Sequence, residues 1–283
     1  MLKARILTAA VLLSVFFFAL FALPPVGWAG FVTLIAALAA WEWGGLMRLD
    51  SGARVASGVV VCALCALLVF AFPSPTGLEN EFPAAARHFG FYFYLPAFVF
   101  WFACVPVWLT RRWPLKPPAL GAATGLLLIL PTWLALIQLK RLGAWPLLAV
   151  MAIVWLADTG GYFFGRSFGR HKLAPSISPG KTWEGVAGGV FAVVVYGFCV
   201  RAAFPELFPE LSAVSPLSFF LALVFLSLFS VVGDLFESML KRQADVKDSS
   251  GLLPGHGGIL DRIDSLTSVL PLVALLCSTV LPR

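Results

Sequence analysis

Long apolar runs recur along the whole chain, separated by short segments that contain most of the charged residues. An α-helix needs about 20 apolar residues to cross the ~30 Å hydrocarbon layer of a membrane. Nine runs of about this length occur, at residues 6–23, 28–46, 55–72, 91–110, 118–138, 145–165, 184–204, 216–239 and 260–281. The pattern therefore predicts an all-α, polytopic membrane protein with about nine transmembrane helices.

The first apolar run has two alternative interpretations. It follows Lys3 and Arg5 and in this respect resembles a secretory signal. However, it is longer than the apolar core of a signal peptide, and no small-x-small cleavage site follows it. We therefore interpret it as the first membrane span.

The composition also indicates a membrane protein. Charged residues make up 12% of the chain and the mean hydropathy is +0.93, whereas a soluble protein has about 25% charged residues. Most ionisable residues at membrane depth lie after residue 155. We predict a single membrane domain over residues 1–283, in which residues 1–140 form a lipid-embedded part and residues 141–283 carry the chemistry.

The Lys and Arg residues predict the orientation, because loops on the cytoplasmic side of a membrane are enriched in them. With nine spans and a cytoplasmic N-terminus, 15 of the 20 Lys and Arg residues lie on the cytoplasmic side and 5 on the other. The same bias explains most of the net charge of +6. The charge is therefore no indication of nucleic-acid binding.

Two polar stripes interrupt the last two apolar runs. Both have the spacing 0, 3, 4 and 7, and they consist of Asp234, Glu237, Ser238 and Lys241 and of Asp261, Asp264, Ser265 and Ser268. This spacing places each set on one face of a helix, so the two faces can meet. Facing carboxylates suit Mg²⁺ or Mn²⁺, which proteins hold with one or two acids and substrate phosphates. Hydrogen bonding between the helices is the alternative interpretation.

The segment between these runs is the most polar part of the chain. This segment and the adjoining helix ends contain the cations Lys241, Arg242, Lys247 and Arg262 and the glycines Gly255, Gly257 and Gly258. Cations beside a metal site are what a polyphosphate requires, and glycines let a ligand approach the backbone. A basic loop attracted to anionic lipid headgroups is the alternative. His256 can either bind a phosphate or support the Gly-Gly turn.

A second polar constellation precedes the seventh apolar run. It consists of Asp158, Ser178, Lys181 and Thr182. A cation and hydroxyls at the start of a helix favour an anion, and a polar loop that only caps the helix is the alternative. The Gly-Lys-Thr at 180–182 is not a P-loop, because a proline replaces the required glycine and no strand precedes it.

Two features outside these constellations remain open. Glu42 lies in an Ala-Trp-Glu-Trp sequence near the end of an apolar run. It can reach the membrane interface or take part in the site. Gly185 and Gly189 form a small-x-x-x-small pair that predicts close helix packing.

The segment from Ser238 to Asp264 resembles the signature of the phosphatidate cytidylyltransferases, also called CDP-diacylglycerol synthases. The matching positions are Ser238, Leu240, Lys241, Arg242, Lys247, Asp248, Ser250, Leu253, Pro254, His256, Gly257, Gly258, Ile259, Asp261, Arg262, Ile263 and Asp264. Asp158 and the segment from Ser176 to Glu184 are similar to the pattern that precedes this signature in the same family.

The resemblance implies transfer of CMP from CTP to phosphatidate, which gives CDP-diacylglycerol and pyrophosphate for phospholipid biosynthesis. We expect Asp234 and Asp261 to bind Mg²⁺ directly, with Asp264 and Asp248 beside them or at a second metal. The cations expected to neutralise phosphates are Lys241, Arg242, Lys247 and Arg262. The residues expected to complete the substrate pocket are Asp158, Ser178, Lys181, Thr182 and Ser238. We place the site at the cytoplasmic face of the inner membrane, and a second, monovalent ion and a homodimer remain open.

Other classes of protein fit the sequence less well. A CTP-dependent polyprenol kinase is the main enzymatic alternative, since it uses the same nucleotide and a lipid acceptor. A secondary transporter would usually show symmetry between its halves, which this chain lacks. A CDP-alcohol phosphotransferase would need an Asp-x-x-Asp-Gly-x-x-Ala-Arg motif, which is absent.

Overall fold

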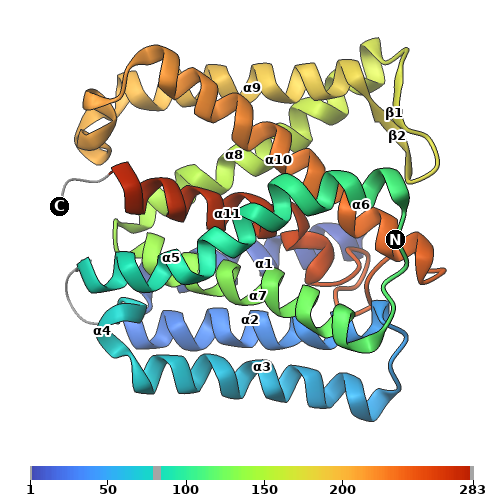
Figure 1. Cartoon of the computed structure of the whole chain (residues 1–283). Helices are drawn as coiled ribbons and strands as arrows, with labels where there is room; N and C mark the ends of the chain where they lie inside the picture. The colour runs from blue at the N-terminus through green and yellow to red at the C-terminus, as the bar shows by residue number, and fades with distance from the viewer. Residues whose placement is uncertain (1, 79–83, 281–283) are drawn as a thin grey trace.

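The computed structural model describes residues 2–78 and 84–280, and it is built almost entirely from helices (Figure 1). The long helices are α1(Leu2–Ala22), α2(Pro25–Leu46), α3(Ser51–Ala71), α5(Ala84–Val99), α7(Pro118–Lys140), α8(Ala144–Phe168), α9(Trp183–Ala203), α10(Pro216–Gln243) and α11(Leu260–Val280). The shorter elements are α4(Pro73–Thr76), the π-helical turn η1(Phe100–Cys104), α6(Val105–Arg111), and the 3₁₀ turns η2(Pro205–Leu207) and η3(Pro209–Ala213).

Every predicted apolar run forms a helix over most of its length. The run at 91–110 corresponds to α5, η1 and α6, which follow one another without a break. Helices are expected here because a backbone in lipid must satisfy its hydrogen bonds internally. Asp50, Thr182 and Ser215 cap α3, α9 and α10, each accepting a hydrogen bond from a backbone N–H in the first turn.

The predicted number of nine spans is not confirmed. Eight helical segments among the described residues are long and apolar enough to cross a membrane, and α11 is not one of them. Its first turns carry Asp261, Arg262 and Asp264, which lower its apolar character. The eight segments make the chain a multi-pass membrane protein.

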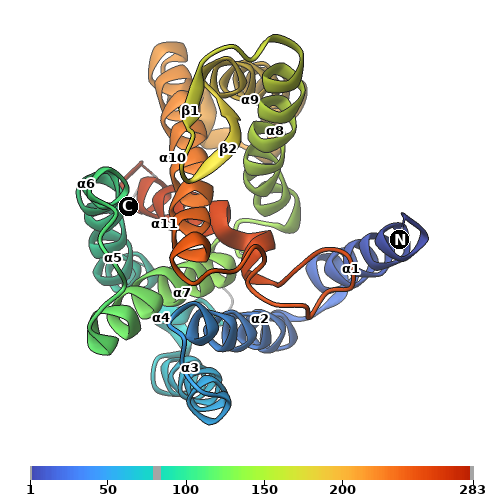
Figure 2. The same ribbon diagram turned by 90° about the vertical axis from the view of Figure 1, so that its right-hand side faces the viewer.

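Helix α11 lies in the middle of the molecule (Figures 1 and 2). It packs against α5, α7, α8 and α10, and every residue from 265 to 274 is buried. Helix α1, in contrast, stands at the edge beside α2 and the loop that leads into α11 (Figure 2). The position of α11 explains its polarity, because a helix surrounded by protein can carry groups that lipid would exclude.

A short β-hairpin is the one departure from the predicted all-α fold in the described chain. Strands β1(Lys172–Ala174) and β2(Ser178–Thr182) pair antiparallel between α8 and α9. The segment is rich in Pro, Ser and Gly and lacks the alternation of apolar and polar residues that is typical of a strand. The hairpin extends along α8 and α10 and brings Lys181 to the polar face of α10.

Glycines bring α8 and α9 close together, as the small-x-x-x-small pair predicts. A Cβ atom on Gly189 would lie 2.6 Å from the carbonyl oxygen of Ala157, and one on Gly185 would lie 2.7 Å from that of Gly161. Both distances are shorter than real Cβ contacts. Side chains larger than hydrogen would therefore push α8 away from α9 and move Asp158 with it.

Several helix ends meet on one face of the molecule. Arg48 after α2 pairs with Asp245 after α10 and donates to the carbonyl of Gln243 at 2.9 Å. The amide of Gln243 in turn donates to the carbonyls of Arg112 and Trp113 after α6. The orientation predicted from the sequence places the ends of α2, α6 and α10 on the same side of the membrane, the cytoplasmic side.

Candidate active site

The polar stripes of α10 and α11 face each other, as their spacing predicts. The helices meet at Gly233, where a Cβ atom would lie 2.7 Å from Ser268 Oγ and 3.0 Å from the carbonyl oxygen of Asp264. About two turns further along α10, Lys241 Nζ lies 2.7 Å from Glu237 Oε2 and 2.6 Å from Asp261 Oδ1. The side chains of Glu237 and Asp261 are 5% and 4% exposed, so this is a buried ion-pair network.

Asp261 also fixes the loop of residues 244–259, which we call the α10–α11 loop. Its Oδ2 atom accepts hydrogen bonds from Ser249 N at 2.9 Å, Ser249 Oγ at 2.9 Å and Gly258 N at 2.8 Å. Because Lys241 binds the other oxygen, both carboxylate oxygens already have donors. Asp261 therefore ties the loop to α11 and α10, and its role as a direct metal ligand stays a prediction.

A second buried carboxylate, on α2, holds the same loop. Glu42 of α2 is fully buried. It accepts hydrogen bonds from Ser249 Oγ at 3.1 Å, Ser250 Oγ at 2.6 Å, Ile259 N at 2.9 Å and Leu260 N at 2.6 Å. Of the two roles left open by the sequence, reaching the interface is wrong. Glu42 supports the site by fixing its loop.

The Gly-Gly pair of the loop makes room for these two carboxylates. Gly257 has a φ of 80°, and a Cβ atom on it would lie 2.6 Å from Asp261 Oδ2. A Cβ atom on Gly258 would lie 2.4 Å from Glu42 Oε1 and 2.1 Å from Ser249 Oγ. At these two positions the backbone closely approaches the protein's own acids. Gly255 and Gly257 also line a pocket, and the predicted approach to a ligand stays a prediction.

Three further carboxylates come from three different helices. The charges of Asp158 on α8, Asp234 on α10 and Asp264 on α11 interact with one another, and those of Lys181 and Arg262 also act on Asp158. Lys181 Nζ forms an ion pair with Asp234 Oδ2 at 2.6 Å. The hairpin that precedes α9 is thus joined to the polar face of α10.

The described residues do not form a ready-made metal cluster. Within residues 2–78 and 84–280, no three Asp, Glu, His or Cys side chains are placed to hold a metal ion together. In this structure Lys181 pairs with Asp234, and Lys241 and the α10–α11 loop engage Asp261, so Asp234, Asp261 and Asp264 stay predicted ligands. Asp234 and Asp264 still fit Mg²⁺, since they are carboxylates of adjoining helices and this ion commonly uses one or two acids with substrate phosphates.

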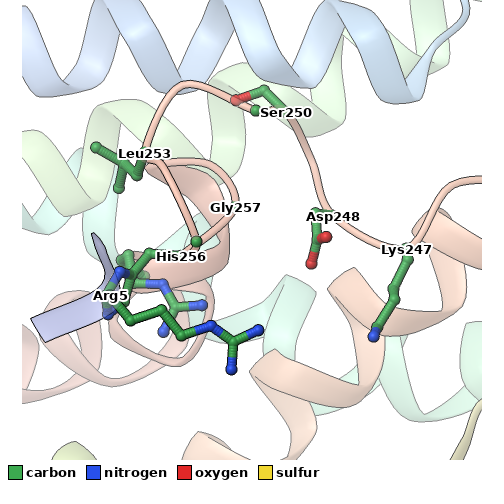
Figure 3. Close-up of a pocket in the computed structure, with 10 residues that line it drawn as sticks. Arg5, Lys247, Asp248, Ser250, Leu253, His256 and Gly257 are labelled. Atoms are coloured by element: carbon green, nitrogen blue, oxygen red, sulfur yellow. The ribbon is translucent and has the colours of Figure 1, made fainter. Parts of the chain in front are cut away.

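Beside the carboxylates lies a cationic pocket of about 480 Å³ (Figure 3). Its charged and titratable lining residues are Arg5, Lys247, Asp248, His256 and Arg262. His256 Nδ1 is buried and has no hydrogen-bond partner in the described part of the chain. The pocket therefore presents cations, which suit a phosphate group, and the unpaired Nδ1 of His256 lies buried in its wall.

Comparison with known proteins agrees with this arrangement of acids and cations. A model of the cytidylyltransferase family matches residues 3–280. The chain belongs to the cytidylyltransferase family. It is 40% identical to the phosphatidate cytidylyltransferase of Pseudomonas aeruginosa, over 98% of this chain and 97% of that protein. It is 34% identical to the one of Haemophilus influenzae, over 96% of each, and 43% identical to the one of Bacillus subtilis over about half of each.

The cations predicted for this cytidylyltransferase occupy three different environments. Lys247 and Arg262 line the pocket. Lys241 pairs with two buried acids and joins α10 to α11, and its contact with a phosphate stays a prediction. Arg242 is exposed and donates to the carbonyl of Val246 at 3.4 Å, outside the pocket lining.

The predicted substrate-binding residues also separate into two groups. Asp158 and Lys181 lie beside the acids of α10 and α11, and Ser238 donates to Asp234 Oδ1 at 3.1 Å. Thr182 is buried and its hydroxyl accepts from Gly185 N at 3.1 Å as the cap of α9. Its hydroxyl is used by the helix, which is the alternative that the sequence left open. Ser178 starts β2, opposite Ala174.

Arg5, Glu42 and Ser249 belong to the site but were not among the predicted residues. Glu42 carried a usable signal, because a carboxylate in an apolar span is by default functional. Arg5 and Ser249 carried none, since a cation before the first span and a serine in a polar loop are common. Arg5 and Glu42 also show that the N-terminal helices contribute directly to the site.

Proposed function

We propose that this chain is a CTP:phosphatidate cytidylyltransferase that works at the cytoplasmic face of the inner membrane and uses Mg²⁺. The observation that carries the proposal is the cationic pocket beside the acids of α8, α10 and α11, at the end of a central helix. Membership of the cytidylyltransferase family, with two relatives of that name matched over nearly their full length, supports it.

In the proposed reaction, a phosphate oxygen of phosphatidate attacks the α-phosphorus of CTP. The new bond joins this oxygen to the α-phosphorus, and the bond from the α-phosphorus to the bridging oxygen breaks, so pyrophosphate leaves with that electron pair. A phosphate monoester has a second pKa near 6 and is largely a dianion at neutral pH. The attack therefore requires no strong base, which agrees with a site that offers one imidazole and several cations.

Charge repulsion is the main obstacle, because a dianion must approach a nucleotide with about four negative charges. Lys247 and Arg262 line the pocket and can neutralise these oxygens directly. Lys181, now paired with Asp234, lies where it can exchange this carboxylate for a phosphate. Mg²⁺ held by Asp234 and Asp264 would supply further charge neutralisation.

The decisive experiment uses purified protein in detergent with CTP labelled at one of two positions. With phosphatidate present, label on the α-phosphate should enter the lipid fraction, and label on the γ-phosphate should leave as pyrophosphate. The polyprenol kinase alternative predicts the reverse, transfer of the γ-label to a polyprenol. Failure of the α-label to reach lipid under any condition that keeps the protein folded would refute the proposed function.

The orientation is tested separately. Reporter fusions at residue 112 and at residue 172 should both give a cytoplasmic signal, since both lie on the side that is rich in Lys and Arg. A periplasmic signal from either fusion would contradict the proposed location of the site.

A further inference from the structure

Arg5 is the one residue of the pocket that comes from the first helix. The other titratable lining residues belong to the α10–α11 loop and the start of α11. Figure 3 shows the Arg5 side chain extending past His256 toward the space that Asp248 and Lys247 also face. A segment near the beginning of the chain thus completes a pocket built by its end.

The contact between Arg5 and the loop is close. Gly255 has a φ of 76°, and a Cβ atom on it would lie 2.7 Å from Arg5 Cγ. The arginine stem therefore lies directly against the loop backbone, and this approach is open only because residue 255 is glycine.

The charges of the pocket match a phosphate monoester. Arg5, Lys247 and Arg262 contribute three positive charges and Asp248 contributes one negative charge, which leaves two positive charges with His256 neutral. A phosphate monoester carries between about −1.5 and −2 at neutral pH. Without Arg5 the balance would fall to a single positive charge.

The surroundings of Arg5 favour a lipid over a nucleotide. The side chains that follow it on α1 are strongly exposed, with Ile6 at 61%, Leu7 at 66% and Val11 at 52%. In a multi-pass membrane protein such a surface faces acyl chains. A lipid whose anionic headgroup reaches Arg5 can keep its acyl chains in the membrane beside this surface.

We propose that Arg5 of α1 completes the binding pocket for the phosphate headgroup of the lipid acceptor. The inference rests on the proposed function for the identity of that acceptor, phosphatidate. It assigns this pocket to the lipid and gives α1 a role in selecting the substrate.

Kinetics of three variants test the assignment. In mixed micelles, Arg5→Ala should raise the KM for phosphatidate about tenfold, as expected for the loss of one charge-assisted contact, and leave the KM for CTP unchanged. Arg5→Lys keeps the charge and should recover much of the loss. Arg111→Ala is the matched control, because Arg111 is an exposed arginine at the end of α6 that does not line the pocket, and it should behave as wild type.

Binding of lipid without turnover provides a second readout. Native mass spectrometry should show less retention of phosphatidate by Arg5→Ala than by wild type, with equal retention of phosphatidylcholine. Equal effects of Arg5→Ala and Arg111→Ala, a change in the KM for CTP alone, or unchanged kinetics and retention would each overturn the assignment. An inactive wild type would instead count against the proposed function, because the retention experiment does not depend on catalysis.

Discussion

Replacement of Glu42 by glutamine tests whether one buried carboxylate holds the α10–α11 loop in place. Its Oε1 atom accepts from Ser250 Oγ and Ile259 N, and its Oε2 atom accepts from Ser249 Oγ and Leu260 N. An amide keeps one oxygen and puts an NH₂ group where the other was. The serine hydroxyl on that side can turn and accept, but the backbone N–H cannot and loses its acceptor.

The cost follows from these four hydrogen bonds. A buried donor without a partner costs about 1–3 kcal/mol, and the remaining bonds each weaken by about 1 kcal/mol because their acceptor is no longer charged. An amide is easier to bury than a carboxylate, which offsets part of the loss. We therefore expect Glu42→Gln to destabilise the protein by about 2–4 kcal/mol.

Two measurements check this estimate. The apparent Tm in detergent should fall by roughly 5–15 °C, if it scales as for soluble chains of this size. The kcat for CMP transfer should fall by about 10²-fold, the effect expected when groups of a site move by about 1 Å. Glu206→Gln, the same change at an exposed glutamate in η2, is the control and should alter neither. A Glu42→Gln variant with wild-type Tm and kcat would refute the role of Glu42 in supporting the loop.

Three other predictions concern the helices around the site. Lys241→Met should lower stability by about 3–5 kcal/mol, because it leaves two buried carboxylates without their cation; an unchanged Tm would show that the ion pairs contribute nothing. Gly189→Ala should cost about 1–3 kcal/mol by forcing α8 from α9, whereas Gly30→Ala, with no atom within 4 Å of its Cβ, should cost nothing. Equal Tm values for these two variants would contradict the close packing. Asp264→Asn should reduce activity by roughly two orders of magnitude and raise the Mg²⁺ concentration that the enzyme requires. It should not lower the Tm, because it relieves the repulsion between Asp264 and the charges of Asp158 and Asp234. If the variant showed the Mg²⁺ titration of the wild type, Asp264 would be excluded as a ligand.

The helices and the pairing of the two polar stripes could be predicted from the sequence, because both depend on spacing within a segment. A run of apolar residues is sufficient to predict a membrane helix. The offsets 0, 3, 4 and 7 place Lys241 on the face that meets Asp261. The β-hairpin could not be predicted, since its Pro and Gly residues do not give a strand pattern.

The partners of individual carboxylates could not be deduced in this way. Glu42 and Leu260 are 218 residues apart, and periodicity does not reveal which helices are neighbours. Asp261 has the charge and the helix position of a metal ligand, yet its oxygens are taken by Lys241 and the backbone of a loop. Which carboxylates remain available to a ligand depends on the conformation of that loop, which the residue pattern does not specify.

The central position of α11 has a consequence for the order in which the protein assembles. Helices emerge from the ribosome in sequence order, and α11 follows every other described helix while packing against α5, α7, α8 and α10. The earlier helices must therefore stay loosely associated in the bilayer until α11, the most polar of the helices, inserts among them. Nascent chains arrested before residue 260 should remain sensitive to protease, and release of α11 should bring resistance to the whole bundle in one late step.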